Sequence, residues 1–235
     1  MLKEIGGTGQ RRLLAATAVV IGAGGIGSPA IQYLAAAGVG TLRIVDDDAV
    51  SLSNLQRQVL FGTDDVGRAK VDVAAAQVVR LNPDVRVQAV RQRLTSANVA
   101  ALLSEADVVL DGSDNFATRL LVSDACTAAR IPLVSAAIGQ FQAQVGGWRG
   151  WEADKPCYRC FVGDAFDADD CDSCSELGLV GAMAGIAGSM GALEALRQIV
   201  SFGGDATGKL HIFDGLVPAM RTLRIVKDPG CRGCG

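Results

Sequence analysis

Residues 17–27 read TAVVIGAGGIG, and this stretch decides the fold. Its first six residues include Val19, Val20 and Ile21 in a row and show no alternation, as expected for a parallel strand that is covered on both faces. The glycines of 22–27 permit a tight turn and let backbone N–H groups approach a phosphate at the start of the next helix, which runs to about residue 37. Alone, this pattern is also typical of an NAD(P) oxidoreductase, because Asp46 ends the next strand, where a ribose hydroxyl is expected.

Strands and helices alternate through the first half of the chain. Apolar runs predict strands over 41–46, 85–90, 107–110 and 131–136, and helices over 67–81, 95–105 and 115–129. Thr95 and Ser96 offer an N-cap to the second of these helices. The alternation predicts a doubly wound, mostly parallel, Rossmann-like α/β sheet.

The pattern changes after about residue 140. Residues 141–151 resemble antiparallel strand material, 152–176 form a polar loop rich in Cys and Asp, and a long apolar helix covers roughly 179–202. Two strands, 209–214 and 221–227, precede the final CRGCG. We therefore expect one domain over 1–235, whose nucleotide-binding half (about 13–137) is continued by a mixed or antiparallel β segment and a metal clasp (about 138–235).

Composition excludes several classes of protein. With 235 residues, of which 49% are hydrophobic and 20% charged, the chain can bury a sizeable core. Its net charge of −3 gives no reason to expect a nucleic acid or an anionic membrane as partner. The uncharged stretches 13–42 and 177–193 do not read as membrane spans, because glycines and a proline divide the first and the second is short. No signal peptide opens the chain, so we expect a cytoplasmic protein.

The seven cysteines form a pattern typical of metal or thiol chemistry. Six of them make three C-x-x-C pairs, Cys157 with Cys160, Cys171 with Cys174, and Cys231 with Cys234, while Cys126 stands apart. The first and last pairs together supply the four thiolates of a closed, tetrahedral Zn²⁺ site. Such a site would be structural and would close a loop of about seventy residues. The alternative is two redox disulfides.

Polar residues after the second strand point to phosphate chemistry. Residues 46–58 read DDDAVSLSNLQRQ and bring Asn54 and Arg57, with Lys70 further on, near the carboxyl ends of the strands. An oxidoreductase has no need for these two cations, which suit a triphosphate and a phosphoryl transition state. The alternative interpretation of Arg57 and Lys70 is that they belong to a solvated helix face. Asp114, at the end of the fourth strand, can hold Mg²⁺, and its alternative is a helix N-cap.

These motifs occur in one order along the chain, namely GAGGIG, VDDDAVSLSNLQRQ, GRAKVD, DGSDNFATR, CYRC, CSELGLVG and CRGCG. The series resembles the ThiF/MoeB/HesA family, the bacterial relatives of ubiquitin-activating enzymes. The resemblance implies an adenylyltransferase: the C-terminal Gly-Gly carboxylate of a small ubiquitin-like sulfur carrier attacks the α-phosphate of ATP and releases pyrophosphate. No general base is required, because a carboxylate is ionised at neutral pH.

The resemblance also assigns residues to the ATP site. Gly25 would approach the phosphates, Asp46 would bind the ribose, Asp114 would bind Mg²⁺ and Asn115 would lie near the nucleotide. The phosphates would be held by Lys70 and by the SLSNLQR run, through Ser53, Asn54, Leu55, Gln56 and Arg57. Arg57, Lys70 and Asp114 would be catalytic. Cys174 matches a cysteine that accepts the activated carrier in thiamin-type members but is not needed in molybdopterin-type members.

The partners follow from the same resemblance. We expect a homodimer that activates a carrier ending in Gly-Gly and passes it to a separate sulfur donor, a cysteine desulfurase or a rhodanese-like protein. Family members begin with a helix whose arginine reaches the neighbouring subunit's ATP site, and this arginine has no counterpart in MLKEIGGTGQ. Two alternatives remain open: a non-catalytic, zinc-stabilised scaffold that binds a carrier, and an NAD(P)-dependent oxidoreductase.

Overall fold

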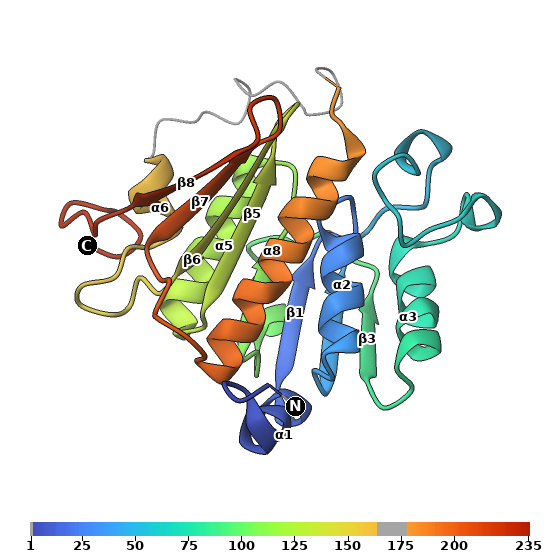
Figure 1. The fold of residues 1–235 in the computed structure, drawn as a ribbon, viewed down its shortest axis with the longest axis horizontal. Coiled ribbons are helices and arrows are strands. Elements are labelled where there is room, and N and C mark those ends of the chain that lie inside the picture. Colours follow the sequence, from blue (N-terminus) through green and yellow to red (C-terminus); the bar gives the residue numbers. More distant parts are fainter. Residues whose placement is uncertain (1, 164–177) are drawn as a thin grey trace.

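A continuous mixed sheet runs through the computed structural model, which describes residues 2–163 and 178–235 (Figure 1). Within these residues the sheet has eight strands in the order β3-β2-β1-β4-β5-β6-β7-β8. The first five strands of that order are parallel, and β6, β7 and β8 join them in antiparallel fashion. The predicted fold class is therefore confirmed.

The strands are β1 (Thr17–Ile21), β2 (Thr41–Val45), β3 (Arg86–Val90), β4 (Val108–Asp111), β5 (Leu133–Ile138), β6 (Gln142–Trp148), β7 (Lys209–Asp214) and β8 (Ala219–Arg224). The helices are α1 (Gly6–Ala15), α2 (Gly27–Ala36), α3 (Lys70–Leu81), α4 (Val99–Leu103), α5 (Phe116–Ala129), α6 (Tyr158–Val162) and α8 (Gly181–Val200). Two short 3₁₀ turns, η1 (Leu52–Asn54) and η2 (Thr63–Asp65), lie between β2 and α3.

Helices cover both faces of the sheet, and each face has its own core. On one face α2 and α8 lie side by side, with α3 beyond α2 (Figure 1). Alternate strand residues such as Val20, Ile44 and Leu110 are fully buried beneath them. On the other face α4, α5 and α6 cover Val19 and Val109. Burial on both faces explains the apolar runs without alternation in the parallel strands.

From β1, in the middle of the parallel part of the sheet, the chain adds β2 and then β3 on one side of β1. It then crosses over and adds β4 on the opposite side of β1. In open α/β sheets this reversal leaves a crevice beyond the carboxyl ends of the two central strands, where ligands bind. Both the glycine turn after β1 and the DGSDN segment after β4 lie at this crevice.

Some predicted elements differ from the structure. Helix α4 is shorter than the predicted 95–105. Thr95 and Ser96 do not cap it, because it begins at Val99 and Asn98 occupies the N-cap position, where the Asn98 Oδ1 accepts from the Thr95 N–H at 2.8 Å. Helix α6 lies within the predicted loop 152–176, and β8 begins two residues before the predicted strand. Helix α1 had not been predicted, since only Gly9 and Leu13 in it are buried and the apolar pattern is therefore faint.

No helix within 2–163 and 178–235 combines the length and the hydropathy needed to cross a membrane. The uncharged stretch 13–42 divides into the end of α1, then β1, α2 and the start of β2, as its glycines and proline suggested. The GxxxG of 181–185 contributes to packing only at Gly181, where a Cβ would lie 2.0 Å from the Gln56 carbonyl oxygen. A Cβ on Gly185 would have no neighbour within 4 Å, whereas one on Gly188 would lie 2.2 Å from the Ile26 carbonyl oxygen of the turn that leads into α2.

Candidate active site

A cavity of about 790 Å³ lies at the crevice between β1 and β4. Its wall brings together six of the ten residues predicted to bind the nucleotide, namely Gly25, Asp46, Arg57, Lys70, Asp114 and Asn115. A cavity of this size and position is the usual binding site of an α/β protein.

The glycine turn forms the floor of the cavity. Gly22 has φ +84°, a conformation that favours glycine, and a Cβ on Gly27 would lie 1.9 Å from the Gly22 carbonyl oxygen. Helix α2 begins at Gly27, so the positive end of its dipole lies beside this turn. The backbone here can therefore approach an anionic ligand closely.

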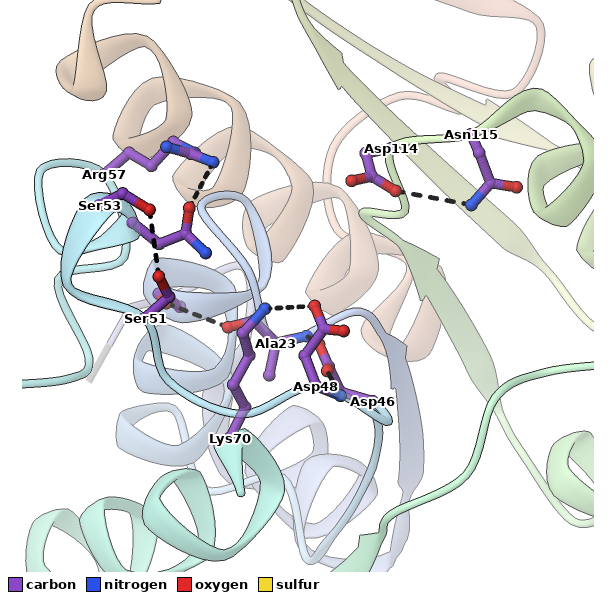
Figure 2. Close-up of polar contacts among 11 residues, drawn as sticks. Ala23, Asp46, Asp48, Ser51, Ser53, Arg57, Lys70, Asp114 and Asn115 are labelled. Atoms are coloured by element: carbon purple, nitrogen blue, oxygen red, sulfur yellow. Dashed lines mark hydrogen bonds and ion pairs between the residues drawn. The ribbon is translucent and has the colours of Figure 1, made fainter. Parts of the chain in front are cut away.

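Asp46 follows β2 directly and is tied to the glycine turn. Its Oδ2 accepts a 2.7 Å hydrogen bond from the Ala23 N–H, and its Oδ1 accepts a 2.8 Å bond from the Asp48 N–H (Figure 2). Burial raises the pKa of Asp46 above its ordinary value, while the charge of Lys70 and the two N–H donors oppose the rise. The carboxylate is thus held in a fixed orientation at the edge of the cavity.

Lys70 is a buried cation. The residue is only 3% exposed at the start of α3, so the interpretation as a solvated helix face is wrong. Its Nζ donates to Asp48 Oδ2 at 2.7 Å, and the Asp48 side chain is 65% exposed (Figure 2). A buried ammonium needs a charged partner. Because Asp48 is exposed, it can turn into solvent and leave Lys70 to an anionic ligand in the cavity.

Arg57 lies at the other side of the glycine turn. A Cβ on Gly25 would lie 3.4 Å from Arg57 Cγ, so the two residues are in contact range. The guanidinium donates from Nη2 to Asn54 Oδ1 at 2.8 Å, and this bond orients it (Figure 2). Arg57 and Lys70 therefore supply two cations to one cavity, from either side of the turn.

Asp114 and Asn115 come from the loop between β4 and α5, across the crevice from these cations. The strand ends at Asp111, one residue after the end of the predicted strand 107–110, so Asp114 lies in the following loop and not at the strand end. Asn115 caps α5, because its Oδ1 accepts from the Thr118 N–H at 2.9 Å, so the interpretation of Asp114 as the N-cap is wrong. The exposed Asp114 carboxylate is left available to a cation in the cavity.

The remaining predicted nucleotide ligands, Ser53, Asn54, Leu55 and Gln56, do not line the cavity. Ser53 Oγ lies 3.1 Å from Ser51 Oγ, Leu55 packs against the core, and the Gln56 carbonyl contacts Gly181 of α8. In this structure the segment positions Arg57 rather than forming the cavity wall. Cys174, with Cys171, lies outside the described residues.

Other cavity residues carried no signal in the sequence. Gln58 is 4% exposed and its buried Oε1 has no hydrogen-bond partner among the described residues. Beyond the nucleotide ligands, the wall continues over β5 and β6 to α6 through Ala137, Gly139, Gln142, Gln144, Tyr158 and Phe161. Glutamine, alanine and tyrosine are common in every fold, so only the strand register shows that these residues meet.

Four cysteine sulfurs form a separate cluster at the end of the chain. The Sγ atoms of Cys157, Cys160, Cys231 and Cys234 all lie within 4.8 Å of one another. The Sγ–Sγ distance is 3.9 Å for Cys157–Cys160, 3.6 Å for Cys157–Cys231 and 3.4 Å for Cys160–Cys234. A tetrahedral ion with 2.3 Å bonds to sulfur places its ligands about 3.8 Å apart. The cluster could therefore bind a metal, and its spacing does not fit disulfides, whose sulfurs lie about 2.05 Å apart.

The cysteine cluster is linked to the cavity through α6. Arg159, between two of the cysteines, donates from Nε and Nη2 to the two Asp124 oxygens, each at 2.7 Å, and thereby joins α6 to α5. Tyr158 and Phe161 pack on Trp148, with ring centroids 5.9 and 6.0 Å away, and also line the cavity. A metal held by the cluster would thus fix one wall of the cavity.

Comparison with known proteins identifies relatives along nearly the whole chain. The profile of the ThiF family matches residues 1–233. The chain is 43% identical to the SAMP-activating enzyme E1 of Haloferax volcanii over 235 residues, which cover 100% of this chain and 86% of the relative. It is 43% identical to a sulfur carrier protein adenylyltransferase of Thermus thermophilus (100% and 88% covered) and 40% identical to the sulfur carrier protein ThiS adenylyltransferase of Escherichia coli (100% and 92% covered).

A solved structure agrees on the fold. A crystal structure of E. coli MccB has a TM-score of 0.83 at 22% identity, and the match covers 96% of this chain and 69% of that one. At this level of identity the likeness concerns the arrangement of the sheet and its helices.

Proposed function

Because the chain belongs to the ThiF family, we propose that it is an ATP-dependent adenylyltransferase that activates the C-terminal Gly-Gly carboxylate of a ubiquitin-like sulfur carrier protein. Its relatives of about 40% identity over the full chain carry this activity in their names. One observation in the cavity carries the proposal: a buried lysine and an oriented arginine flank a glycine turn, opposite an available carboxylate. This set suits a polyphosphate and has no role in hydride transfer.

The reaction needs positioning and charge compensation more than proton transfer. An oxygen of the carrier's carboxylate attacks the α-phosphorus of ATP, the bond from that phosphorus to the bridging oxygen breaks, and pyrophosphate leaves with the electron pair. The carboxylate is already ionised at neutral pH, so no base is required. Charge accumulates on the departing pyrophosphate, where preorganised cations lower the barrier most.

Each cavity residue takes one part of this task. Asp46 binds the ribose hydroxyls, and the N–H groups beside Gly25 bind the phosphates. Lys70 turns from Asp48 to the phosphates, and Arg57 stabilises the leaving pyrophosphate. Asp114 holds Mg²⁺, which neutralises phosphate charge when bound and which accepts oxygen ligands of this kind.

The remaining parts of the proposal concern partners and place. The four-cysteine cluster binds a structural Zn²⁺, which its sulfur separations support. The protein acts as a homodimer, and the carrier adenylate passes to a sulfur donor such as a cysteine desulfurase or a rhodanese-like protein. We place the protein in the cytoplasm, where a reducing environment keeps metal-binding thiols available.

ATP–pyrophosphate exchange tests this function. The protein is incubated with ATP, Mg²⁺, labelled pyrophosphate and one of several small carriers that end in Gly-Gly. Label should enter ATP with one intact carrier and not with the same carrier lacking its last two residues. Carrier binding without exchange would favour the non-catalytic scaffold, and binding of NADH but not of ATP–Mg²⁺ would favour an oxidoreductase.

A further inference from the structure

The cavity extends well beyond the glycine turn. From the DGSDN loop it continues across β5 and β6 to α6, and none of the described residues that line it on or beside these three elements is charged. Its wall there consists of small residues such as Ala137 and Gly139, the aromatic rings of α6, and the amides of Gln142 and Gln144. The cations that suit phosphates, Lys70 and Arg57, lie at the glycine-turn end of the cavity. The end formed by β5, β6 and α6 therefore suits an uncharged part of a ligand.

Strand β6, which carries the two glutamines, is an interior strand. It pairs with β5 on one side and with β7 on the other, so that Gln144 lies between Ala137 and Ile212. Its backbone N–H and C=O groups are therefore engaged in the sheet, and an incoming peptide cannot add to it as a new strand. Only side chains on the face of β6 remain to bind a ligand.

Gln142 and Gln144 are those side chains. Residues two apart on a strand point to the same face, about 7 Å from each other. The intervening Ala143 and the next residue, Val145, are buried in the core beneath α8. Both glutamines are half-buried, and neither amide has a hydrogen-bond partner among the residues that the structure describes. Each amide offers both a donor and an acceptor.

An extended peptide has the complementary spacing. Its N–H and C=O groups on one side also recur every two residues, about 7 Å apart. We propose that Gln142 and Gln144 bind the main chain of the carrier's extended C-terminal tail and guide its carboxylate toward the nucleotide. The inference rests on the proposed function and assigns the determinants of tail recognition within the same cavity.

The same wall explains a preference for glycine. Recognition through main-chain groups requires the tail to lie close to the β6 face. Ala137 of β5 and Gly139, just after that strand, would flank it on one side, and the rings of Tyr158 and Phe161 on the other. A side chain on the last tail residues would hold the main chain away from the two amides. Glycine lacks this obstacle, so the tail is selected by its small size and not by a side chain.

The test replaces each amide with an apolar group of similar size. In Gln142→Leu and Gln144→Leu, KM for the carrier in ATP–pyrophosphate exchange should rise about 3- to 10-fold for each bond lost, and more in the double variant. The value of kcat and the affinity for ATP should change less than about 2-fold, because these bonds position the tail and not the phosphates. Gln77→Leu, on α3 away from the cavity, is the matched control and should leave KM unchanged.

A chemical change in the tail separates direct contact from structural damage. A carrier in which an ester replaces the peptide bond between the two terminal glycines lacks one N–H donor. With the parent protein, this carrier should have a higher KM. In the variant that lacks the glutamine amide which accepted from that N–H, the ester should raise KM little further. Unchanged KM in the double variant, or a fall in kcat alone, would overturn the inference while leaving adenylation intact. Absence of exchange in the parent protein with every carrier would instead reject the proposed function, and the inference with it.

Discussion

Lys70, at the start of α3, carries a buried charge at the wall of the cavity. A lysine at the start of an amphipathic helix is commonly solvated, yet here it is 4% exposed at its side chain and bound to a carboxylate that is 65% exposed. The Lys70 ammonium is thus paired inside the cavity with Asp48, whose exposed side chain can turn into solvent. Its presence also opposes the rise in the Asp46 pKa that burial causes.

We expect Lys70→Met and Arg57→Ala each to lower the rate of ATP–pyrophosphate exchange by about 10²-fold or more, because each removes a preorganised cation from the transition state. Lys70→Met should still fold, since methionine fills the same apolar space and Asp48 is already solvated. Arg68→Ala is the control, because the Arg68 side chain is 55% exposed and forms an ion pair with Asp65, three residues earlier in the chain. Rates near those of the parent protein in either variant would remove that residue from the catalytic set.

Asp205 provides a prediction for pH. Burial alone would raise its pKa, but the Thr207 N–H, Lys155 and Arg149 outweigh burial and lower the pKa to about 2. Because the folded pKa lies below the ordinary value of 3.8, the stabilisation is present above pH 4 and is lost as the pH falls toward 2. The side chain is 43% exposed, which limits its contribution to less than about 1 kcal/mol.

Asp205→Asn should therefore be less stable than the parent protein at pH 7, and the two should converge as the pH is lowered from 4 to 2. Urea unfolding at several pH values measures the difference. A constant difference across this range would show that the ion pairs of Asp205 do not stabilise the folded state.

At the scale of elements, helix α8 packs on α2 through its small residues. A Cβ on Gly188 would lie 2.2 Å from the Ile26 carbonyl and 2.5 Å from Pro29 Cγ, whereas one on Gly185 would meet nothing within 4 Å. Gly188→Ala must therefore force the two helices apart, and we expect it to lower the free energy of unfolding by at least about 2 kcal/mol. Gly185→Ala should raise it by about 0.5–1 kcal/mol through helix propensity. Equal effects in urea unfolding would contradict this packing.

The cysteine cluster joins the chain end to α6 and, through Arg159 and Asp124, to α5. Chelation of its metal should lower the melting temperature by at least about 5 °C, because metal binding contributes to folding free energy. The KM for the carrier should rise more than that for ATP, since Tyr158 and Phe161 line the far end of the cavity. Metal analysis and calorimetry check the first point, and an apo protein that melts like the parent would reject a structural metal.

Elements with strong periodicity or sharp chemical signatures could be predicted from the sequence. The parallel strands, α5 and the cysteine pairs belong to this group, because continuous apolar runs and C-x-x-C spacings leave few alternatives. Helices α4 and α6, of five residues each, bury too few positions to give a helical period. Strand order and pairing, which the sequence pattern does not reveal, place the other cavity residues. Gln142 and Gln144 line the cavity only because β6 lies between β5 and β7.

In the whole molecule, the parallel and antiparallel halves of the sheet have different tasks. The crevice between β1 and β4 holds the glycine turn and the cations, while β5, β6 and α6 extend the same cavity toward the cysteine cluster. A single sheet therefore aligns the proposed nucleotide end and the proposed tail end along one continuous cavity. In the proposed binding mode, the tail carboxylate and the phosphates of ATP meet within this one cavity.

Transfer of oxygen from the carrier to the nucleotide tests whether the tail carboxylate attacks the α-phosphorus of ATP. A carrier whose C-terminal carboxylate is labelled with ¹⁸O is incubated with the protein, ATP and Mg²⁺, and the nucleotide product is examined by mass spectrometry after the acyl-adenylate has hydrolysed at its carbonyl carbon. We expect ¹⁸O in AMP and unlabelled pyrophosphate. ADP together with ¹⁸O in inorganic phosphate would instead show attack at the γ-phosphorus and would rule out adenylation.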